Sequence, residues 1–283
     1  MSFRRLERGA PGYPPLLAAI PDPPAVLWLR GIAEPTLLAR PAVAVVGARA
    51  CSSYGRTVAR MLGRELAVAG LVVVSGLARG VDGEAHRGAL EGGGLTVAVL
   101  GCGIDRDYPA AHRDLARQVA GEGLIVSEYP PGVEPAPWRF PARNRIIAGL
   151  CAATVVVEAR ERSGALITAD FALEEGREVF AVPGEITSSL SAGSNALLRL
   201  GAVPLTGAED VLESFGLVGA VRAEPELAPE TAAVLASVRE TARSADELAR
   251  ATGLSADELA VALTELELAG VVNEAEGIYR PVV

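Results

Sequence analysis

The stretch VAVVGARACSSYG, residues 43–55, decides the fold of this chain. Its first four residues are apolar and suit a buried strand, and Gly47 permits a sharp turn directly after them. Ser52 or Ser53 can then cap a helix, because a serine hydroxyl accepts a hydrogen bond from the free amides at a helix start. Strand, glycine turn and helix in this order predict the first unit of a nucleotide-binding α/β domain.

The same unit recurs along the chain. Further apolar runs of strand length lie at residues 71–74, 97–100, 124–126, 154–158, 179–182 and 203–205. Seven strands alternating with helices predict an α/β fold, an open parallel sheet with helices on both faces. Right-handed crossovers bring the turns after these strands to one edge of the sheet, which is the expected ligand site.

Composition narrows the class of protein. Of the 283 residues, 50% are hydrophobic and only 4% aromatic, so aliphatic side chains must form the core. With three scattered cysteines, no secretory signal and no membrane-spanning apolar run, we expect a cytoplasmic protein without a metal site. The net charge of −9 arises mainly in residues 222–283, which hold 12 acidic residues and five arginines. All 26 basic residues are arginine, whose planar fork can bind a phosphate through two hydrogen bonds.

Changes in composition predict four segments. They are a Pro-rich lead-in (1–40) that packs on the main domain, the α/β domain (41–216), a linker (217–229) and a small C-terminal module (230–283). In the module, Ser244 with Glu247 and Ser255 with Glu258 have the spacing of capping boxes that start two successive helices. Because an alternating, hairpin-like segment follows, the module is predicted to be a winged helix.

Arg49 stands where a dinucleotide-binding turn would have its second glycine. The second strand also ends without the acidic residue that would bind a ribose, so no nicotinamide or flavin cofactor is expected. An arginine beside the helix start, together with Gly47, Ser52 and Ser53, suits a phosphodiester instead. The alternative is that Arg49 only forms a surface ion pair.

The segment around FPARNRIIAGL (140–150) combines basic and aromatic side chains. Its candidate nucleic-acid contacts are Arg139, Arg143, Asn144 and Arg145, interleaved with Trp138 and Phe140. Arginine forks for phosphates and flat rings for bases are the features of single-strand binding sites. Two alternatives remain open: the arginines could pair with the acids of SEYPPG (127–132) or EAEG (274–277), and Asn144 could be only a helix cap.

Two more strand-to-helix turns offer amides and hydroxyls. The residues that they contribute are Ser75, Gly76, Arg79, Ser163, Gly164 and Thr168. A single Ser-Gly turn is weak evidence, because glycine often serves only the geometry of a turn. Four such turns on one sheet edge, with three arginine-bearing loops, predict a track for a polyanion.

No catalytic or metal-binding residues are predicted. His86 and His112 lie in predicted helices without a serine or cysteine partner, and the chain has no lysine for a phosphate-binding P-loop. The second capped helix of the module, SADELAVALTELELAG (255–270), carries acidic residues and no basic one. Since acids facing phosphates repel them, contact with a protein or packing on the main domain fits this helix better than DNA reading.

Taken together, these motifs resemble the DNA-processing protein A (DprA, also called Smf) family. The matching segments, in order over about residues 12–215, are GYPPLLAAIPDPPAVLWLRG, VAVVGARACSSYG, VVVSGLARGVDGEAH, VAVLGCGIDRDYP, SEYPPG, FPARNRIIAGL, SGALITA and EEGREVFAVPG. The resemblance implies an extended Rossmann-like domain without catalytic activity or cofactor, in which Arg49, Arg143 and Arg145 line a DNA pocket. It also implies that the protein binds and protects single-stranded DNA, loads a RecA-type recombinase during natural transformation, and forms a homodimer through residues about 195–213.

One departure from the family and two competing functions remain. The family's first turn reads G-S-R, whereas this chain has G-A-R and so lacks one hydroxyl beside Arg49. Some enzymes of related fold cleave nucleoside monophosphates at the glycosidic bond and carry a P-G-G-x-G-T turn, which this chain replaces by VPGEIT (182–187). A transcription regulator acting through the winged helix is the third interpretation, and it would prefer duplex DNA.

Overall fold

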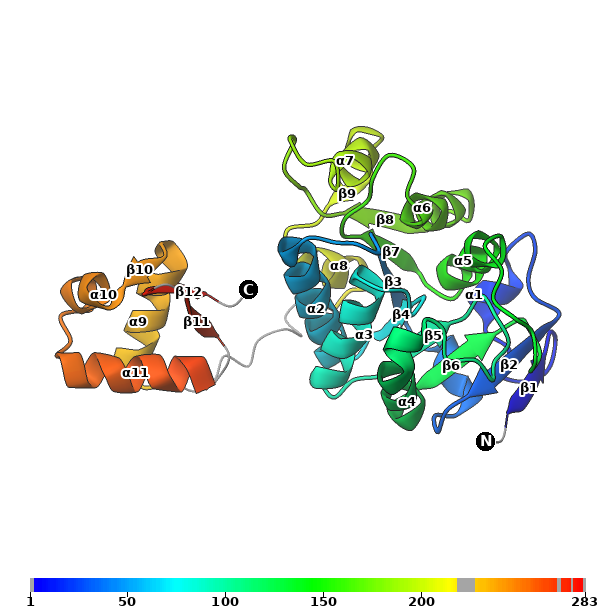
Figure 1. Ribbon diagram of the computed structural model, residues 1–283, viewed down its shortest axis with the longest axis horizontal. Helices are drawn as coiled ribbons and strands as arrows, with labels where there is room; N and C mark the ends of the chain where they lie inside the picture. The colour runs from blue at the N-terminus through cyan, green and yellow to red at the C-terminus, as the bar shows by residue number, and fades with distance from the viewer. Residues whose placement is uncertain (1–2, 218–226, 269–270, 276, 282–283) are drawn as a thin grey trace. The chain divides into compact units, whose positions relative to one another are not determined.

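Two compact units make up the chain, Met1–Val221 and Arg222–Val283. The computed structural model, drawn in Figure 1, describes residues 3–217, 227–268, 271–275 and 277–281. Most of the predicted linker, 217–229, lies outside the described residues. Each unit has its own apolar core.

A mixed sheet organises the first unit. Among the described residues its strand order is β1-β2-β6-β5-β4-β3-β7-β8-β9. The strands are β1 (Arg4–Glu7), β2 (Val26–Arg30), β3 (Ala42–Val46), β4 (Val72–Ser75), β5 (Thr96–Val99), β6 (Leu124–Ser127), β7 (Ala153–Val156), β8 (Glu178–Ala181) and β9 (Val203–Pro204). Strands β3 to β9 run parallel to one another, which confirms the seven predicted strands and the open parallel sheet.

The structure differs from the prediction for residues 1–40. The lead-in does not only pack on the main domain, because it adds β1 and β2 to the sheet, antiparallel and beyond β6. In β2 both Leu27 and Leu29 are fully buried, whereas β1 buries only Leu6. Strands this short show little alternation between apolar and polar residues, and that alternation is the pattern that identifies a strand in a sequence.

Helices cover both faces of the sheet, as predicted (Figure 1). One face carries α2 (Ser53–Val68), α3 (Val81–Glu91), α4 (Arg113–Glu122) and α8 (Ala208–Ser214), and the other carries α1 (Pro15–Ala18), α5 (Arg139–Gly149), α6 (Gly164–Glu174) and α7 (Ala192–Arg199). Two 3-10 turns, η1 (Pro35–Ala39) and η2 (Ala110–His112), lie between these elements. In the central strand β3, Val43 and Val45 pack under the first set of helices and Val46 under the second. The strand is therefore buried on both faces, as its continuous apolar sequence indicates.

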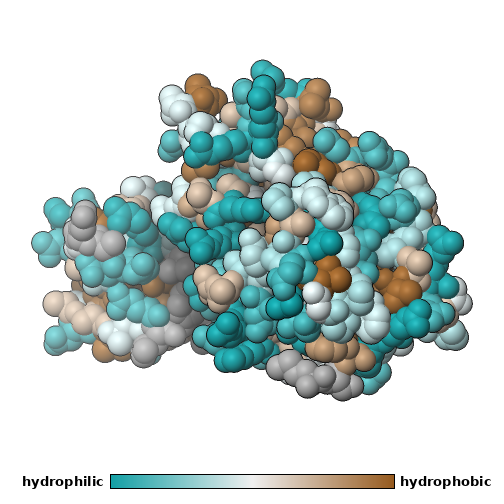
Figure 2. All heavy atoms as spheres, turned by 45° about the vertical axis from the view of Figure 1, so that its right-hand side comes forward, coloured by the Kyte–Doolittle hydropathy of each residue, from teal (hydrophilic) through white to brown (hydrophobic). Residues whose placement is uncertain are grey.

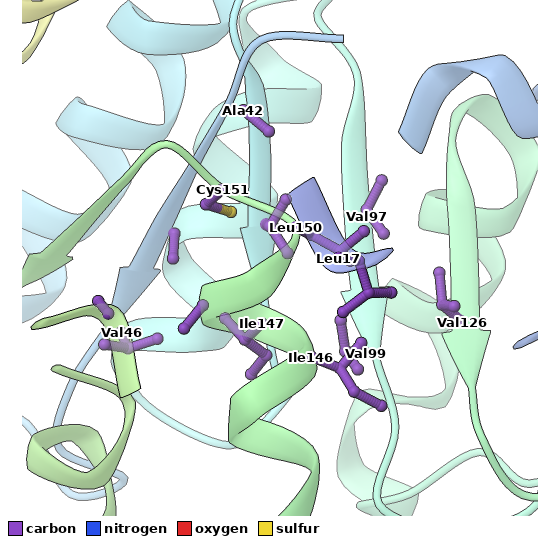
Figure 3. Packing of buried hydrophobic residues seen from close by; sticks show 14 of the residues in the cluster. Leu17, Ala42, Val46, Val97, Val99, Val126, Ile146, Ile147, Leu150 and Cys151 are labelled. Carbon is purple, nitrogen blue, oxygen red and sulfur yellow. The ribbon is translucent and has the colours of Figure 1, made fainter. Parts of the chain in front are cut away.

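Helix α5 brings the arginine-rich segment to the sheet edge. Its residues Ile146 and Ile147 lie in one apolar cluster with Val46 and Val99, the last residues of β3 and β5 (Figure 3). Full burial of one such aliphatic side chain stabilises the fold by about 1.5–3 kcal/mol relative to exposure. This packing fixes α5, so the preceding turn of the helix is held against the carboxyl ends of the strands.

The second unit has the predicted winged-helix order. Its elements are α9 (Pro229–Glu240), β10 (Arg243–Ser244), α10 (Ala245–Thr252), α11 (Ala256–Leu268), β11 (Val272–Ala275) and β12 (Ile278–Pro281). Both predicted capping boxes are present: the Ser244 amide donates to Glu247 at 2.8 Å, and the Ser255 amide donates to Glu258 at 2.9 Å. Leu248 and Leu266 belong to the core of this unit.

His86, a residue of α3, is fully buried and is neutral. Thr96 donates its hydroxyl proton to the Val73 carbonyl oxygen at 2.7 Å, so its oxygen must accept from His86 Nδ1, which lies 2.7 Å away. Burial, aided by the positive charges of nearby side chains, lowers the pKa of His86 from 6.5 to about 3. A buried histidine that serves the core agrees with the absence of any predicted catalytic role.

This burial predicts acid sensitivity of the fold. In the unfolded chain His86 takes up a proton near pH 6.5, but the folded state resists protonation down to about pH 3. The free energy of unfolding should therefore fall as pH drops through this window, by up to about 1.4 kcal/mol per pH unit from this side chain. In His86→Asn, whose amide can still donate to Thr96, urea titrations followed by tryptophan fluorescence should show a shallower pH dependence. An unchanged pH dependence would contradict the assignment.

Candidate nucleic-acid interface

The predicted ligand edge lies at the topological switch point of the sheet, where β3 has β4 on one side and β7 on the other. Two adjoining cavities open at this edge, a first of about 240 Å³ and a second of about 390 Å³. Of the predicted site residues, the first cavity is lined by Gly47, Arg49, Arg143, Asn144, Ser163, Gly164 and Thr168, and the second by Arg49, Gly76, Arg79 and Arg143. Residues from three separate strand-to-helix turns and from helix α5 thus lie at one place.

Arg49 is exposed at the rim shared by the two cavities. Its guanidinium carbon lies 5.4 Å from the centroid of the Phe140 ring, a cation–π distance. No described residue forms a hydrogen bond or ion pair with it, so the surface ion pair considered as the alternative is not formed within the described chain. Its charge is directed at the two cavities and is available to an anion.

Arg143 is buried, contrary to the expectation of an open phosphate contact, and only 5% of it is exposed. Its guanidinium donates to the carbonyl oxygens of Gly76 and Val99, and Nε donates to the Asn144 side chain at 3.1 Å. Asp82 lies 4.0 Å from the guanidinium. These internal partners take up Nε and Nη1, and Nη2 lies nearest to Asp82, so Arg143 braces the wall of both cavities rather than reaching into solvent.

Asp82 closes the turn between β4 and α3. Its carboxylate accepts from the amides of Gly76 at 3.1 Å and Ala78 at 3.3 Å, so the Gly76 turn that the sequence predicts to be open to an anion is occupied. Burial raises the pKa of Asp82, while burial lowers the pKa of its neighbour Arg143 to about 10. Gly76 is required here, because a Cβ at this position would collide with the Arg143 guanidinium.

Glu158 closes the start of α2 in the same way. The Ser52 amide donates to Glu158 Oε2 at 2.9 Å, and the Ser52 hydroxyl donates to Oε1. The same hydroxyl oxygen caps α2 by accepting from the Gly55 amide at 3.0 Å, as predicted for this helix. Ser52 is therefore occupied by the protein's own carboxylate and does not offer the predicted donors to a ligand.

The start of α6 is the turn that stays open. Ser163 caps the helix by accepting from the Ala165 amide at 3.3 Å, and the Gly164 amide has no partner among the described residues. Asn144 donates to the Gly164 carbonyl oxygen at 3.0 Å, so it ties α5 to α6 instead of capping its own helix. The Gly164 amide and the positive end of an 11-residue helix lie at the first cavity, which is a favourable place for a phosphate.

The remaining predicted arginines differ in their partners: within the described chain Arg145 is paired with carboxylates, whereas Arg79 and Arg139 are not. Arg79 is exposed and lines the second cavity, and Arg139 lies 4.9 Å from the Tyr129 ring and 4.8 Å from the Trp138 ring. Arg145 instead pairs with Glu128 at 2.8 Å and Asp22 at 3.0 Å. Glu128 belongs to SEYPPG, so the alternative pairing considered from the sequence is the one present.

Of the three other predicted hydroxyl-bearing residues, only Thr168 lines a cavity. Ser75 is fully buried and donates to the Val45 carbonyl oxygen at 2.7 Å, so it stabilises the sheet and does not face the cavities. Ser53 is exposed as the first residue of α2, outside both cavities. Thr168 is a buried residue of α6 that lines the first cavity.

Sequence reasoning missed Tyr108, which contributes to the wall of the second cavity. Its ring stacks on Phe140 with 5.2 Å between centroids and an interplanar angle of 22°. Tyr108 is 42% exposed, so part of the ring remains open to a ligand. The signal was present in the sequence DYP (107–109), an aromatic residue and a proline in a loop after a glycine turn.

Neither a reactive thiol nor a metal site accompanies the cavities. Cys51, Cys102 and Cys151 are buried, and burial raises the pKa of each thiol, to about 11 for Cys102. No cluster of three or more potential ligand side chains in the described residues could hold a metal ion. Within the same part of the chain, every helix is too short or too polar to cross a bilayer.

Two sequence-family models match the chain, one for each unit. Residues 5–216 match DNA recombination-mediator protein A, and residues 219–277 match the DprA winged helix domain. The DNA processing protein DprA of Streptococcus pneumoniae is 48% identical over 205 residues, 72% of this chain and 71% of that protein. Protein Smf of Escherichia coli is 41% identical over 279 residues, 94% of this chain and 74% of that protein.

Solved structures agree with these matches. The X-ray structure of DNA processing protein A from Streptococcus pneumoniae has a TM-score of 0.71 at 46% identity, over 75% of this chain and 74% of that chain. A structure that addresses the single-stranded DNA binding mode of DNA processing protein A from Helicobacter pylori has a TM-score of 0.68 at 31% identity, over 75% and 95% of the two chains. The matched names describe a recombination mediator and DNA processing proteins, which agrees with the expectation that this chain is not an enzyme. Because the mediator model extends over most of the first unit, where both cavities lie, the chain belongs to the DNA recombination-mediator protein A (DprA/Smf) family.

Proposed function

We propose that the chain binds single-stranded DNA across the carboxyl ends of β3, β4 and β5 and protects the bound strand. The observation that carries this proposal is the position of Arg49, an exposed guanidinium without a described carboxylate partner at the rim of both cavities. At the first cavity, the start of α6 supplies the Gly164 amide. A phosphate held between an arginine fork and a helix start receives charge-assisted hydrogen bonds from both sides.

The second cavity supplies the surface for a base. Tyr108 and Phe140 form its aromatic wall, and Arg79 adds a positive charge at its margin. Base stacking on aromatic rings is worth about 1–3 kcal/mol per base and depends little on which base is present. A duplex keeps its bases stacked inside, so this pairing of phosphate and ring contacts favours an unpaired strand.

We further propose that the chain loads a RecA-type recombinase onto the strand that it binds, during natural transformation. Two findings support this: residues 5–216 match a family described as recombination mediators, and the Helicobacter pylori relative is described by its single-stranded DNA binding mode. The three cysteines are free thiols, which supports a cytoplasmic location because a reducing compartment keeps thiols unpaired.

A homodimer through residues about 195–213 is part of the same proposal. Leu200 is 83% exposed and Val203 is 42% exposed, at the end of α7 and in the outermost strand β9. Figure 2 shows hydrophobic side chains at the top of the molecule, the level at which Figure 1 places α6 and α7. Exposed apolar residues beside a sheet edge are typical of a protein–protein contact.

The test is a comparison of two DNA probes. A labelled single strand of about 30 nucleotides and the same sequence as a duplex are titrated with protein between about 50 and 200 mM salt. We expect tighter binding of the single strand, and a linear fall of the logarithm of its binding constant with the logarithm of salt. Equal or tighter binding of the duplex would favour the winged helix as the DNA-binding element and contradict the proposal.

A further inference from the structure

We infer that Glu158 is a specificity-determining residue, whose carboxylate occupies the phosphate position of the Rossmann-like fold and thereby excludes free nucleotides. In an open α/β sheet a nucleotide places its pyrophosphate at the helix start after the first parallel strand, beside the switch point. Here that helix is α2, which follows β3. The inference rests on the proposed function, because it explains why the ligand edge accepts a strand of DNA rather than a mononucleotide.

The contacts of Glu158 use the first donors at the start of α2, the amide and the hydroxyl of Ser52. Its two carboxylate oxygens accept from the Ser52 amide and the Ser52 hydroxyl, as described above. The Ala48 amide, at the preceding turn, donates to the Glu158 carbonyl oxygen at 2.7 Å. Only 4% of Glu158 is exposed, so a ligand cannot reach these donors unless the side chain leaves.

In the GARACSSYG segment, Gly55 leaves the room that the Glu158 side chain fills. A Cβ on Gly55 would collide with the Glu158 carboxylate, whereas a Cβ on Gly47 would first collide with Val81 and would approach the Glu158 carbonyl oxygen to 3.0 Å. In a dinucleotide site, glycines at such a turn give the pyrophosphate room to approach the backbone. In this chain the same room is filled by an internal carboxylate, which also repels a second anion.

The neighbouring turn also holds an internal carboxylate. Asp82 accepts from the two amides after β4, so both turns on the β4 side of the switch point hold an internal anion. At the first cavity, Arg49 and the Gly164 amide are the groups without an internal carboxylate partner among the described residues. Arg49 and the start of α6 can bind the phosphates of a polynucleotide, which are spaced one by one along the strand. The start of α2, where a nucleotide would place its pyrophosphate, is filled by Glu158.

The experiment removes the internal carboxylate and measures binding of pyrophosphate and ADP by calorimetry. Glu158→Ala should bind these probes at least tenfold more tightly than the wild-type chain, because the freed donors of α2 become available to them. The matched control is Glu175→Ala, since Glu175 also has a side chain only 4% exposed but lies at the far end of α6. It should bind both probes as weakly as the wild type.

Two further measurements separate the possible failures. If Glu158→Ala does not fold, as judged by circular dichroism, Glu158→Gln keeps the side-chain size and an acceptor for Ser52 while it removes the repelling charge. A folded variant that binds oligo-dT but gains no affinity for pyrophosphate or ADP overturns the inference and leaves the proposed function standing. A variant that gains nucleotide binding while neither it nor the wild type binds oligo-dT supports the role of Glu158 and refutes the proposed function.

Discussion

Replacing Arg49 by alanine is expected to weaken binding of oligo-dT about tenfold or more. Arg49 is the exposed guanidinium at the rim of both cavities, and a hydrogen bond between charged groups contributes about 1.5–3 kcal/mol. Because its only described partner is the Phe140 ring at 5.4 Å, its removal should leave the fold intact. Fluorescence anisotropy with a labelled oligo-dT measures the affinity, and urea titration checks the stability.

The matched control for this variant is Arg117→Ala. Arg117 is an exposed arginine of α4 that pairs with Asp114 and lies outside both cavities, so the two variants lose the same charge. We expect Arg117→Ala to bind oligo-dT nearly as the wild type does. Similar losses in the two variants would mean that Arg49 acts only through the overall charge of the protein.

Replacing Arg143 by alanine is expected to destabilise the fold, by about 3–5 kcal/mol. The variant leaves Asp82 as a buried carboxylate without its cation, and it removes the donors to the Gly76 and Val99 carbonyl oxygens. Urea denaturation followed by tryptophan fluorescence measures the loss, because Trp28 and Trp138 both lie in the first unit. A stability within about 1 kcal/mol of the wild type would show that the arginine is not an internal brace.

A double variant identifies the cause of this loss. In Asp82→Asn with Arg143→Met the buried charges are removed together, while the asparagine oxygen can still accept from the amides of Gly76 and Ala78. Since an unpaired buried charge is the main cost of the single variant, the double variant should recover more than about 1 kcal/mol. A double variant no more stable than Arg143→Ala would assign the loss to the hydrogen bonds alone.

The architecture followed from the sequence because the inner strands are apolar on both faces and end in glycine turns. Val43–Val46 and the equivalent runs are buried as predicted, and Ser52 and Ser163 cap the two helices that were expected to start there. The strands of the lead-in escaped prediction, since β1 buries a single residue, Leu6. Local sequence patterns identify elements that are long or regular, and the strands β1 and β2 at the edge of this sheet are neither.

The site was predictable as a region but not side chain by side chain. Of the arginines in the FPARNR segment, Arg143 lines both cavities but turns inward, and Arg145 lies outside them and turns toward Glu128. Residues that are two positions apart on a helix, such as Arg143 and Arg145, point in directions that differ by about 200°. The number of charges in the sequence does not reveal this difference. Composition shows which groups are near the edge, and the rotation of α5 decides which of them meet solvent.

Long-range contacts account for the other differences. Glu158 fills the start of α2 from a position 106 residues along the chain, and Asp82 fills the turn in which Gly76 lies. Each of these carboxylates removes a helix-start or turn site that appears open when the segment is considered alone. Sequence reasoning therefore predicts more anion sites than the fold leaves available, and the start of α6 is the one that remains with Arg49.

The salt dependence of oligo-dT binding tests most directly whether Arg49 contacts a phosphate. For a single strand, the slope of the logarithm of the binding constant against the logarithm of salt changes by about 0.7 for each phosphate contact. We predict that Arg49→Ala has a slope shallower than the wild-type slope by about this amount, and that Arg117→Ala has the wild-type slope. An Arg49→Ala slope equal to that of the wild type would contradict the phosphate contact, and with it the proposed track across the sheet edge.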